Sequence, residues 1–266
     1  IWALTKQLEA GDFVPVAYEM RFENGKIDRV DLCKDKDKVY VKVLDYKTGS
    51  KAFDVVALYH GLQLQLMVYM DAAVKMTQKH YPDSEVIPAG VFYYRLNDPL
   101  VEKKVVGEEE EIWQKVLKEL KVDGVMNLKD ETLEHLDHCQ AGESAVIPVK
   151  YNKNGSLSKN SKVASEQEFE VMMRHAMGKV LKVHRKILSG EVAAFPYRRK
   201  QESGCDYCAY RHICGFDQKI PGYKYRDIFE MTQSEVIAAM EADAVKENVN
   251  RDDHEKEQEK GTGSWE

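Results

Sequence analysis

Acidic and basic side chains sit where two short apolar segments end. The segments cover residues 25–33 and 39–47, and the charged run 34–38 joins them. Apolar and polar residues alternate in both, which predicts two antiparallel strands of a hairpin. Asp45 and Lys47 have the same parity, so a strand directs both side chains to one face. The hairpin therefore predicts an acid and a lysine as neighbours where its second strand ends.

Asp28 is predicted to add a second carboxylate beside Asp45 and Lys47. If the hairpin pairs in simple register, Asp28 approaches the face that carries Asp45 and Lys47. Two carboxylates are hard oxygen ligands that suit Mg²⁺, and a lysine beside them can orient or help to deprotonate a water. The carbonyl of Tyr46 is a further candidate ligand. The alternative is a solvated strand end, but an acid that closes an apolar strand usually has a partner or a function.

A cysteine-rich segment is the second chemical signal. Cys205, Cys208 and Cys214 are separated by two and five residues. Thiolates at such spacing suit a soft metal or an iron–sulfur cluster. Two alternatives stay open, namely a zinc site completed by His212 and a set of buried small apolar side chains.

The elements that position these residues follow from hydrophobic periodicity. Gln65 and Tyr69 are one turn apart on a predicted helix, and Glu19 lies on a predicted strand, either solvated or near the site. The predicted strands are 14–22, the hairpin and 86–96, and the predicted helices are 1–10, 59–80, 108–121 and 165–190. Residues 123–140 are predicted to be irregular, and 150–162, with four lysines, to be a mobile loop that contacts either DNA phosphate or only solvent.

Three motifs in the first seventy residues resemble a known family. They are Gly-x-Ile-Asp-Arg-Val at 25–30, Asp-Tyr-Lys-Thr-Gly at 45–49 and Gln-Leu-Met-Val-Tyr at 65–69, and they resemble the RecB-family branch of the PD-(D/E)XK nucleases. The resemblance implies an α/β, restriction-endonuclease-like core with a mixed central sheet flanked by helices. It also implies site roles: Asp28 and Asp45 bind Mg²⁺ or Mn²⁺, Lys47 is catalytic, and Gln65 and Tyr69 line the site.

The cysteine segment extends the resemblance over residues 1 to about 242. Cys-x-Tyr-Cys-x-Tyr-x-x-x-Cys-Gly-Phe-Asp at 205–217 resembles the nuclease domains of AddB-type subunits of helicase–nucleases. The resemblance implies that Cys205, Cys208 and Cys214 hold a [4Fe-4S] cluster with a fourth cysteine from far upstream. Cys33 and Cys139 do not match that ligand position and are interpreted as structural. The related nucleases also supply a metal-binding histidine before the hairpin, whereas no histidine precedes His60 in this chain.

Length, composition and charge limit the classes of protein to which this chain can belong. A chain of 266 residues, 43% hydrophobic, can bury a sizeable core. Of the net charge of −6, residues 241–266 carry −5, so DNA contacts require local basic patches on a nearly neutral body. Five cysteines argue against a secreted disulfide framework, and no apolar run reaches a membrane span, so a cytoplasmic location is predicted. The start at Ile1 instead of methionine indicates a fragment.

The predicted domains are a nuclease domain over 1–225 and a C-terminal helix with an acidic flexible tail over 226–266. The first comprises a core at about 12–100, an insertion at about 101–163, and a long helix with the cysteine motif at 164–217. By resemblance, we expect a Mg²⁺-dependent deoxyribonuclease that cuts a single strand from an unwound duplex end, in a heterodimer with an AddA-type subunit that processes double-strand breaks for recombinational repair. The alternative is a non-catalytic module for DNA-end binding and subunit docking.

Overall fold

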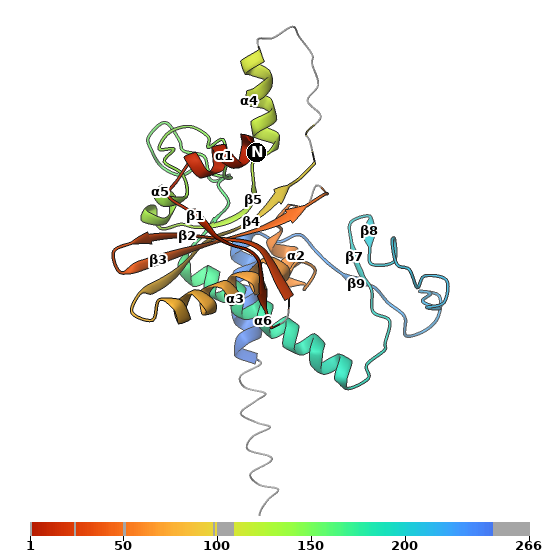
Figure 1. Cartoon of the computed structure of the whole chain (residues 1–266). Coiled ribbons are helices and arrows are strands. Elements are labelled where there is room, and N and C mark those ends of the chain that lie inside the picture. Colours follow the sequence, from red (N-terminus) through yellow and green to blue (C-terminus); the bar gives the residue numbers. More distant parts are fainter. Residues whose placement is uncertain (1, 24, 50–51, 98, 100–108, 247–266) are drawn as a thin grey trace, which may run out of the picture. The chain divides into compact units, whose positions relative to one another are not determined.

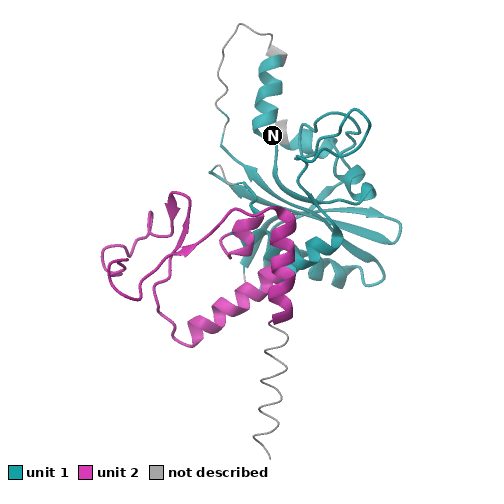
Figure 2. Ribbon diagram, turned by 180° about the vertical axis from the view of Figure 1, so that it is seen from behind, with its two compact units in different colours: residues 1–54, 63–174 teal, residues 55–62, 175–266 magenta. Residues whose placement is uncertain are grey.

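The computed structural model describes residues 2–23, 25–49, 52–97, 99 and 109–246. The chain divides into two compact units, shown in Figure 2. Unit 1 comprises residues 1–54 and 63–174, and unit 2 comprises residues 55–62 and 175–266.

Unit 1 is built on a mixed sheet of six strands that lie in sequence order (Figure 1). The strands are β1 (Val14–Phe22), β2 (Gly25–Asp35), β3 (Lys38–Lys47), β4 (Glu85–Arg95), β5 (Asp123–Asn127) and β6 (Val163–Ala164). β1, β2 and β3 are antiparallel, β3 and β4 are parallel, β4 and β5 are antiparallel, and β5 and β6 are parallel. The predicted α/β class with a mixed sheet is confirmed.

Helix α3 (Gln65–His80) connects the parallel strands β3 and β4 and packs on both. Parallel neighbours need such a crossover because a tight turn cannot reverse the chain twice. Leu66, Met70 and Ala73 form an apolar stripe at helical spacing and are fully buried. The other face of the sheet is covered by α5 (Asp130–Leu136) and by the segment around Val146 (Figure 1).

The single helix predicted over 59–80 was wrong. Helix α2 (Val55–Tyr59) starts earlier and ends before α3 begins. Gly61 has φ +81°, which glycine adopts without steric cost, and the N–H of Leu62 donates to the carbonyl of Ala57 at 2.8 Å. This Schellman-type ending stops the first helix, although the apolar periodicity continues across it.

The irregular segment predicted over 123–140 was also wrong, because it contains β5 and α5. Asp123 and Gly124 are weak strand formers, but β5 lies beside β4 with Val125 and Met126 buried. Tertiary pairing overrides local propensity here. Residues 150–162 form turns with an isolated bridge between Tyr151 and Leu157.

Behind the hairpin, β2 and β3 bury a group of three charges. Arg29 forms two hydrogen bonds to Asp31, at 2.6 and 2.7 Å, and Lys42 Nζ lies 3.0 Å from Asp31 Oδ2. Arg29, Asp31 and Lys42 are 1%, 0% and 7% exposed. Burial on this scale is tolerated because each charge has an opposite partner.

The remaining elements of unit 1 are helices. Helix α1 (Trp2–Glu9) precedes the sheet, and α4 (Glu109–Glu119) lies within the predicted insertion. Helix α6 (Glu166–Leu188) begins in unit 1 with a capping box. Ser165 Oγ accepts the N–H of Glu168 at 3.2 Å, and Glu168 Oε2 accepts the N–H of Ser165 at 2.6 Å.

Unit 2 contains α2, the rest of α6, a small sheet and a helix over residues 233–246. The sheet has the order β8-β7-β9 and consists of β8 (Glu202–Ser203), β7 (Tyr197–Arg199) and β9 (Arg226–Asp227). Among the helices described in the two units, none is long and apolar enough to cross a membrane.

Candidate functional site

The ends of β2 and β3 bring the two predicted carboxylates together. Arg29 pairs with Leu44, so the same antiparallel register places Asp28 opposite Asp45. Opposite residues in such a pair direct their side chains to the same face. The N–H of Tyr46 donates to Asp28 Oδ2 at 2.9 Å, which fixes the Asp28 carboxylate against β3. The simple register predicted for the hairpin is confirmed.

Lys47 links this strand end to helix α3. Its Nζ lies 2.5 Å from Asp45 Oδ2 and donates to Gln65 Oε1 at 2.9 Å. Gln65 Nε2 in turn donates to the hydroxyl of Tyr69 at 2.8 Å. Gln65 is the first residue of α3, and Tyr69 follows one turn later. The structure thus joins the four side chains in one chain of polar contacts across two elements.

Burial gives the ion pair its electrostatic strength. Asp45 is 1% exposed, whereas the Lys47 side chain keeps 25% of its surface open to solvent. A charge pair in such surroundings is less screened than one at the surface. Asp45 is therefore held as an ordered side chain, while part of Lys47 remains accessible to solvent.

Tyr93 belongs to this site, although sequence reasoning did not select it. It pairs with Asp45 in the register of β3 and β4, and Lys47 Nζ lies 5.7 Å from the centre of its ring. Burial, reinforced by Asp45 and then Asp123, raises the pKa of the Tyr93 hydroxyl well above its ordinary value. The phenol therefore stays neutral at physiological pH. The signal available in the sequence is the position of Tyr93 in the predicted strand 86–96, at the same parity as the apolar residue Val91.

Asp123 was also missed, because its segment was expected to be irregular. Its Oδ2 accepts the N–H of Phe53 at 2.6 Å, and its Oδ1 pairs with Lys162 Nζ. Asp123 therefore anchors the chain that follows the hairpin to β5. Asn97 donates from its side-chain amide to the carbonyl of Thr48, which ties the same region to the end of β4.

Glu19 and Tyr46 are two further residues that the sequence analysis considered for this site. The Glu19 side chain is 73% exposed and pairs with Lys26 at 3.1 Å, and Glu19 adopts φ 51°. Glu19 is therefore a solvated strand residue, which is the first of the two alternatives predicted for it. The Tyr46 ring lies edge-on to Tyr94, with ring centres 5.8 Å apart, and the proposed use of the Tyr46 carbonyl stays a prediction.

Unit 2 places His60 among cations. Burial, followed by Arg226, Lys179 and Arg199, lowers the pKa of His60 below its ordinary value. The imidazole is therefore mainly neutral at neutral pH, within a locally positive environment.

The cysteine motif of unit 2 lies in a turn-rich segment. Cys205 and Cys208 are half-buried and Cys214 is exposed, and all three are free thiols. Among the described residues, these three sulfur atoms do not form a group in which all ligand atoms lie within 4.8 Å of one another. Iron–sulfur binding by Cys205, Cys208 and Cys214, like zinc binding with His212, stays a prediction.

Comparison with known proteins identifies the family of the chain. Residues 1–215 match the PD-(D/E)XK nuclease superfamily. The chain is 39% identical over 250 residues to the B subunit of the ATP-dependent helicase/deoxyribonuclease of Lachnoclostridium phytofermentans, covering 88% of this chain and 21% of that protein. For the protein of the same name from Alkaliphilus oremlandii, the identity is 33%, covering 94% of this chain and 23% of the relative.

The chain spans about a fifth of the length of the curated relatives that it matches. The superfamily match, by contrast, covers most of the chain, including β2, β3 and α3 with the polar contacts described above. The chain therefore belongs to the PD-(D/E)XK nuclease superfamily.

Proposed function

We propose that this chain is the DNA-cutting domain of a helicase–nuclease subunit and hydrolyses phosphodiester bonds with the help of Mg²⁺ or Mn²⁺. The observation that carries the proposal is the placement of Asp28 opposite Asp45, with Lys47 paired to the buried Asp45 at 2.5 Å. Membership of a nuclease superfamily supports the same reaction class.

The donor set fits a divalent cation. Asp28 and Asp45 supply two carboxylates from facing residues, and hard oxygen donors are those that Mg²⁺ and Mn²⁺ prefer. The Tyr46 carbonyl is proposed as a third oxygen donor. When bound, the cation supplies Lewis acidity toward the phosphate and lowers the pKa of a water.

Each protein group has a separate proposed role. Lys47 holds an ammonium next to the carboxylates, where it orients the attacking water and offsets charge that develops on the phosphate. Gln65 accepts a hydrogen bond from Lys47 and thereby fixes the direction of that ammonium. Tyr69 keeps Gln65 in position through its hydroxyl.

The substrate and partner are proposed from the relatives. Their names describe the B subunit of an ATP-dependent helicase/deoxyribonuclease, which implies a second subunit and a DNA substrate. We infer an AddA-type partner and a single strand from an unwound duplex end, processed for recombinational repair in the cytoplasm. The cations around His60 in unit 2 support contact with phosphate.

The domain boundaries and the cluster follow as parts of this proposal. We place the nuclease domain at 1–225 and a C-terminal region at 226–266, in which a helix covers residues 233–246. The cysteine segment elaborates the core and holds a [4Fe-4S] cluster once a fourth cysteine is supplied from outside this chain. Soft thiolate ligands suit such a cluster.

The test is cleavage of end-labelled single-stranded DNA by the chain with Mg²⁺, with Mn²⁺ and with EDTA. We expect metal-dependent products and a loss of about 10²-fold or more in rate for Asp45→Asn, since a catalytic metal supplies several kcal/mol. Lys75→Ala is the matched control, because Lys75 forms an exposed pair with Asp71 on α3. Binding of DNA without any cleavage, with or without metal, would favour the second candidate function, DNA-end binding and subunit docking.

A further inference from the structure

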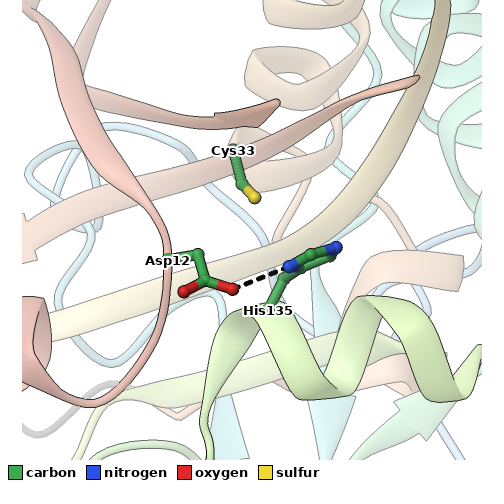
Figure 3. A group of neighbouring side chains, drawn as sticks. All are labelled: Asp12, Cys33 and His135. Atoms are coloured by element: carbon green, nitrogen blue, oxygen red, sulfur yellow. Dashed lines mark hydrogen bonds and ion pairs between the residues drawn. The ribbon is translucent and has the colours of Figure 1, made fainter. Parts of the chain in front are cut away.

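We propose that Asp12, Cys33, His135 and His138 form a zinc-type metal site that is separate from the nuclease residues. Figure 3 shows three of these side chains facing one another. The ligand atoms of Asp12, Cys33 and His135 all lie within 4.8 Å of one another. Cys33 differs in parity from Asp28 on β2, so its side chain points to the opposite face of the sheet.

Asp12 is the centre of the group. His135 Nδ1 lies 2.8 Å from Asp12 Oδ2, and His138 Nε2 lies 3.0 Å from Asp12 Oδ1. The two histidines flank the C-terminal end of α5, whereas Cys33 projects from β2. Three segments that are distant in sequence therefore converge on one point, all within unit 1.

The backbone holds two of these segments together. The N–H of Asp12 donates to the carbonyl of His135 at 2.8 Å, and the N–H of His138 donates to the carbonyl of Ala10 at 2.7 Å. A Cβ on Gly11 would lie 2.3 Å from the carbonyl oxygen of His135, so only glycine permits this approach. The Asp12 carboxylate is therefore brought to the histidines before any metal arrives.

The ligand types select the metal. One thiolate, two imidazoles and one carboxylate suit Zn²⁺ or another borderline-soft cation, whereas Mg²⁺ prefers oxygen alone. Zinc binds sulfur at about 2.3 Å and nitrogen or oxygen at about 2.0–2.2 Å. In a tetrahedral site, these bond lengths place neighbouring ligand atoms ~3.3–3.7 Å apart. Metal binding therefore requires the hydrogen bonds at Asp12 to open by about half an ångström.

Access to solvent also agrees with a metal site, and a bound metal would displace the proton of the Cys33 thiol. Cys33 is buried at 4%, but the Asp12 and His138 side chains are 47% and 58% exposed, so the site opens to solvent on one side.

An outer carboxylate is present as well. His135 Nε2 lies 3.9 Å from Asp35 Oδ2. Metal-binding histidines usually direct their second nitrogen to a carboxylate or a carbonyl, which fixes the tautomer. With Nδ1 on the metal, Asp35 would hold the His135 ring. The His138 side chain contacts Asp12 but lies outside the group whose ligand atoms are within 4.8 Å of one another, so it must move onto the metal to become the fourth ligand. Four protein ligands would then leave no open position, and the metal would have a structural role, fastening residues 10–13 and the end of α5 to β2.

The test uses Co²⁺ as a spectroscopic probe in the full chain, with Cys205, Cys208 and Cys214 changed to Ser to remove the other thiols. We expect one equivalent of Co²⁺ with tetrahedral d–d bands and a thiolate-to-cobalt absorption. Cys33→Ala should abolish that absorption, and His138→Gln should weaken Co²⁺ affinity about 10-fold or more. Cys139→Ser is the matched control, because Cys139 Sγ donates to the carbonyl of Ala141 near the same helix.

The proposal is overturned if the background variant shows no thiolate-to-cobalt absorption, or if that absorption survives Cys33→Ala. Circular dichroism and a metal-free melt establish whether Cys33→Ala is folded. If it is not, His138→Gln decides, because His138 is exposed and its loss leaves the core intact. In folded variants, Zn²⁺ should raise the melting temperature of the background chain and leave that of Asp12→Asn unchanged.

Discussion

Lys47 Nζ lies 2.5 Å from Asp45 Oδ2, an ion pair between two residues that are neighbours on the same face of one strand. The two-residue period of a strand is enough to bring Lys47 and Asp45 together. The direction of the Lys47 ammonium also depends on α3, where Gln65 accepts a hydrogen bond from Lys47 at 2.9 Å. The ammonium is therefore held between a strand and a helix and is not free to rotate about the end of its own strand.

The hydrogen bond between Gln65 and Tyr69 can be tested by Tyr69→Phe. The hydroxyl of Tyr69 accepts from Gln65 at 2.8 Å, so its loss frees Gln65 and loosens Lys47. A hydrogen bond of this kind contributes about 0.5–1.5 kcal/mol, so kcat for DNA cleavage should fall by about 2- to 10-fold. Tyr18→Phe, at an exposed tyrosine of β1, is the control. Equal cleavage rates for the two variants would show that the Tyr69 hydroxyl does not contribute to the site.

Removal of one charge from the buried group behind the hairpin should destabilise the fold strongly. Asp31→Asn leaves Arg29 and Lys42 without their shared carboxylate, and the three residues are at most 7% exposed. Breaking a buried pair in this way typically costs about 3–5 kcal/mol. Urea denaturation monitored by circular dichroism measures the change in the free energy of unfolding.

The exposed residue Lys153 gives a control for that measurement. Lys153→Ala should change the unfolding free energy by less than about 0.5 kcal/mol, as surface substitutions usually do. A similar small change for Asp31→Asn would show that the three buried charges do not depend on one another.

A pH dependence is expected at Glu230 in unit 2. Its carboxylate accepts from Arg199 at 2.8 and 3.0 Å and pairs with Lys200 at 3.1 Å, which lowers the pKa of Glu230 to about 2. A lowered folded pKa stabilises the folded chain above the ordinary value of 4.5, and this contribution is lost as the pH falls toward about 2.

NMR titration of the Glu230 side-chain carboxyl carbon checks this value directly. The midpoint should lie near 2 in the native chain and should move up toward 4.5 in Arg199→Gln, because Arg199 is the largest cause of the shift. A midpoint that does not respond to Arg199→Gln would contradict the assignment of the partner.

The cysteine motif makes a prediction about cofactor content. A longer chain that supplies the upstream cysteine should bind iron and sulfide in a ratio near one, with visible charge-transfer absorption. Replacement of Cys208 by Ser should remove both, whereas His212→Ala should leave them unchanged. Stoichiometric zinc without iron, lost in His212→Ala, would show instead that His212 completes a zinc site.

Strand period was enough to predict that Asp28, Asp45 and Lys47 lie together, whereas their nuclease roles came from the resemblance to a known family. Asp45 and Lys47 share a face because they are two residues apart on an apolar strand, and Asp28 reaches that face because a short charged turn fixes the register of the hairpin. Helical spacing placed Gln65 and Tyr69 one turn apart, but their assignment to the site came from the resemblance to the nuclease family. These relationships are local, and local periodicity determines them.

Tertiary structure decided the rest. Tyr93 reaches Asp45 only because β4 lies parallel to β3, and Asp123 anchors Phe53 only because β5 pairs with β4. The group of Asp12, Cys33 and His135 joins residues up to 123 positions apart, whose meeting depends on how α5 packs against β2. No periodicity encodes such contacts, because they result from the burial of apolar faces that belong to different elements.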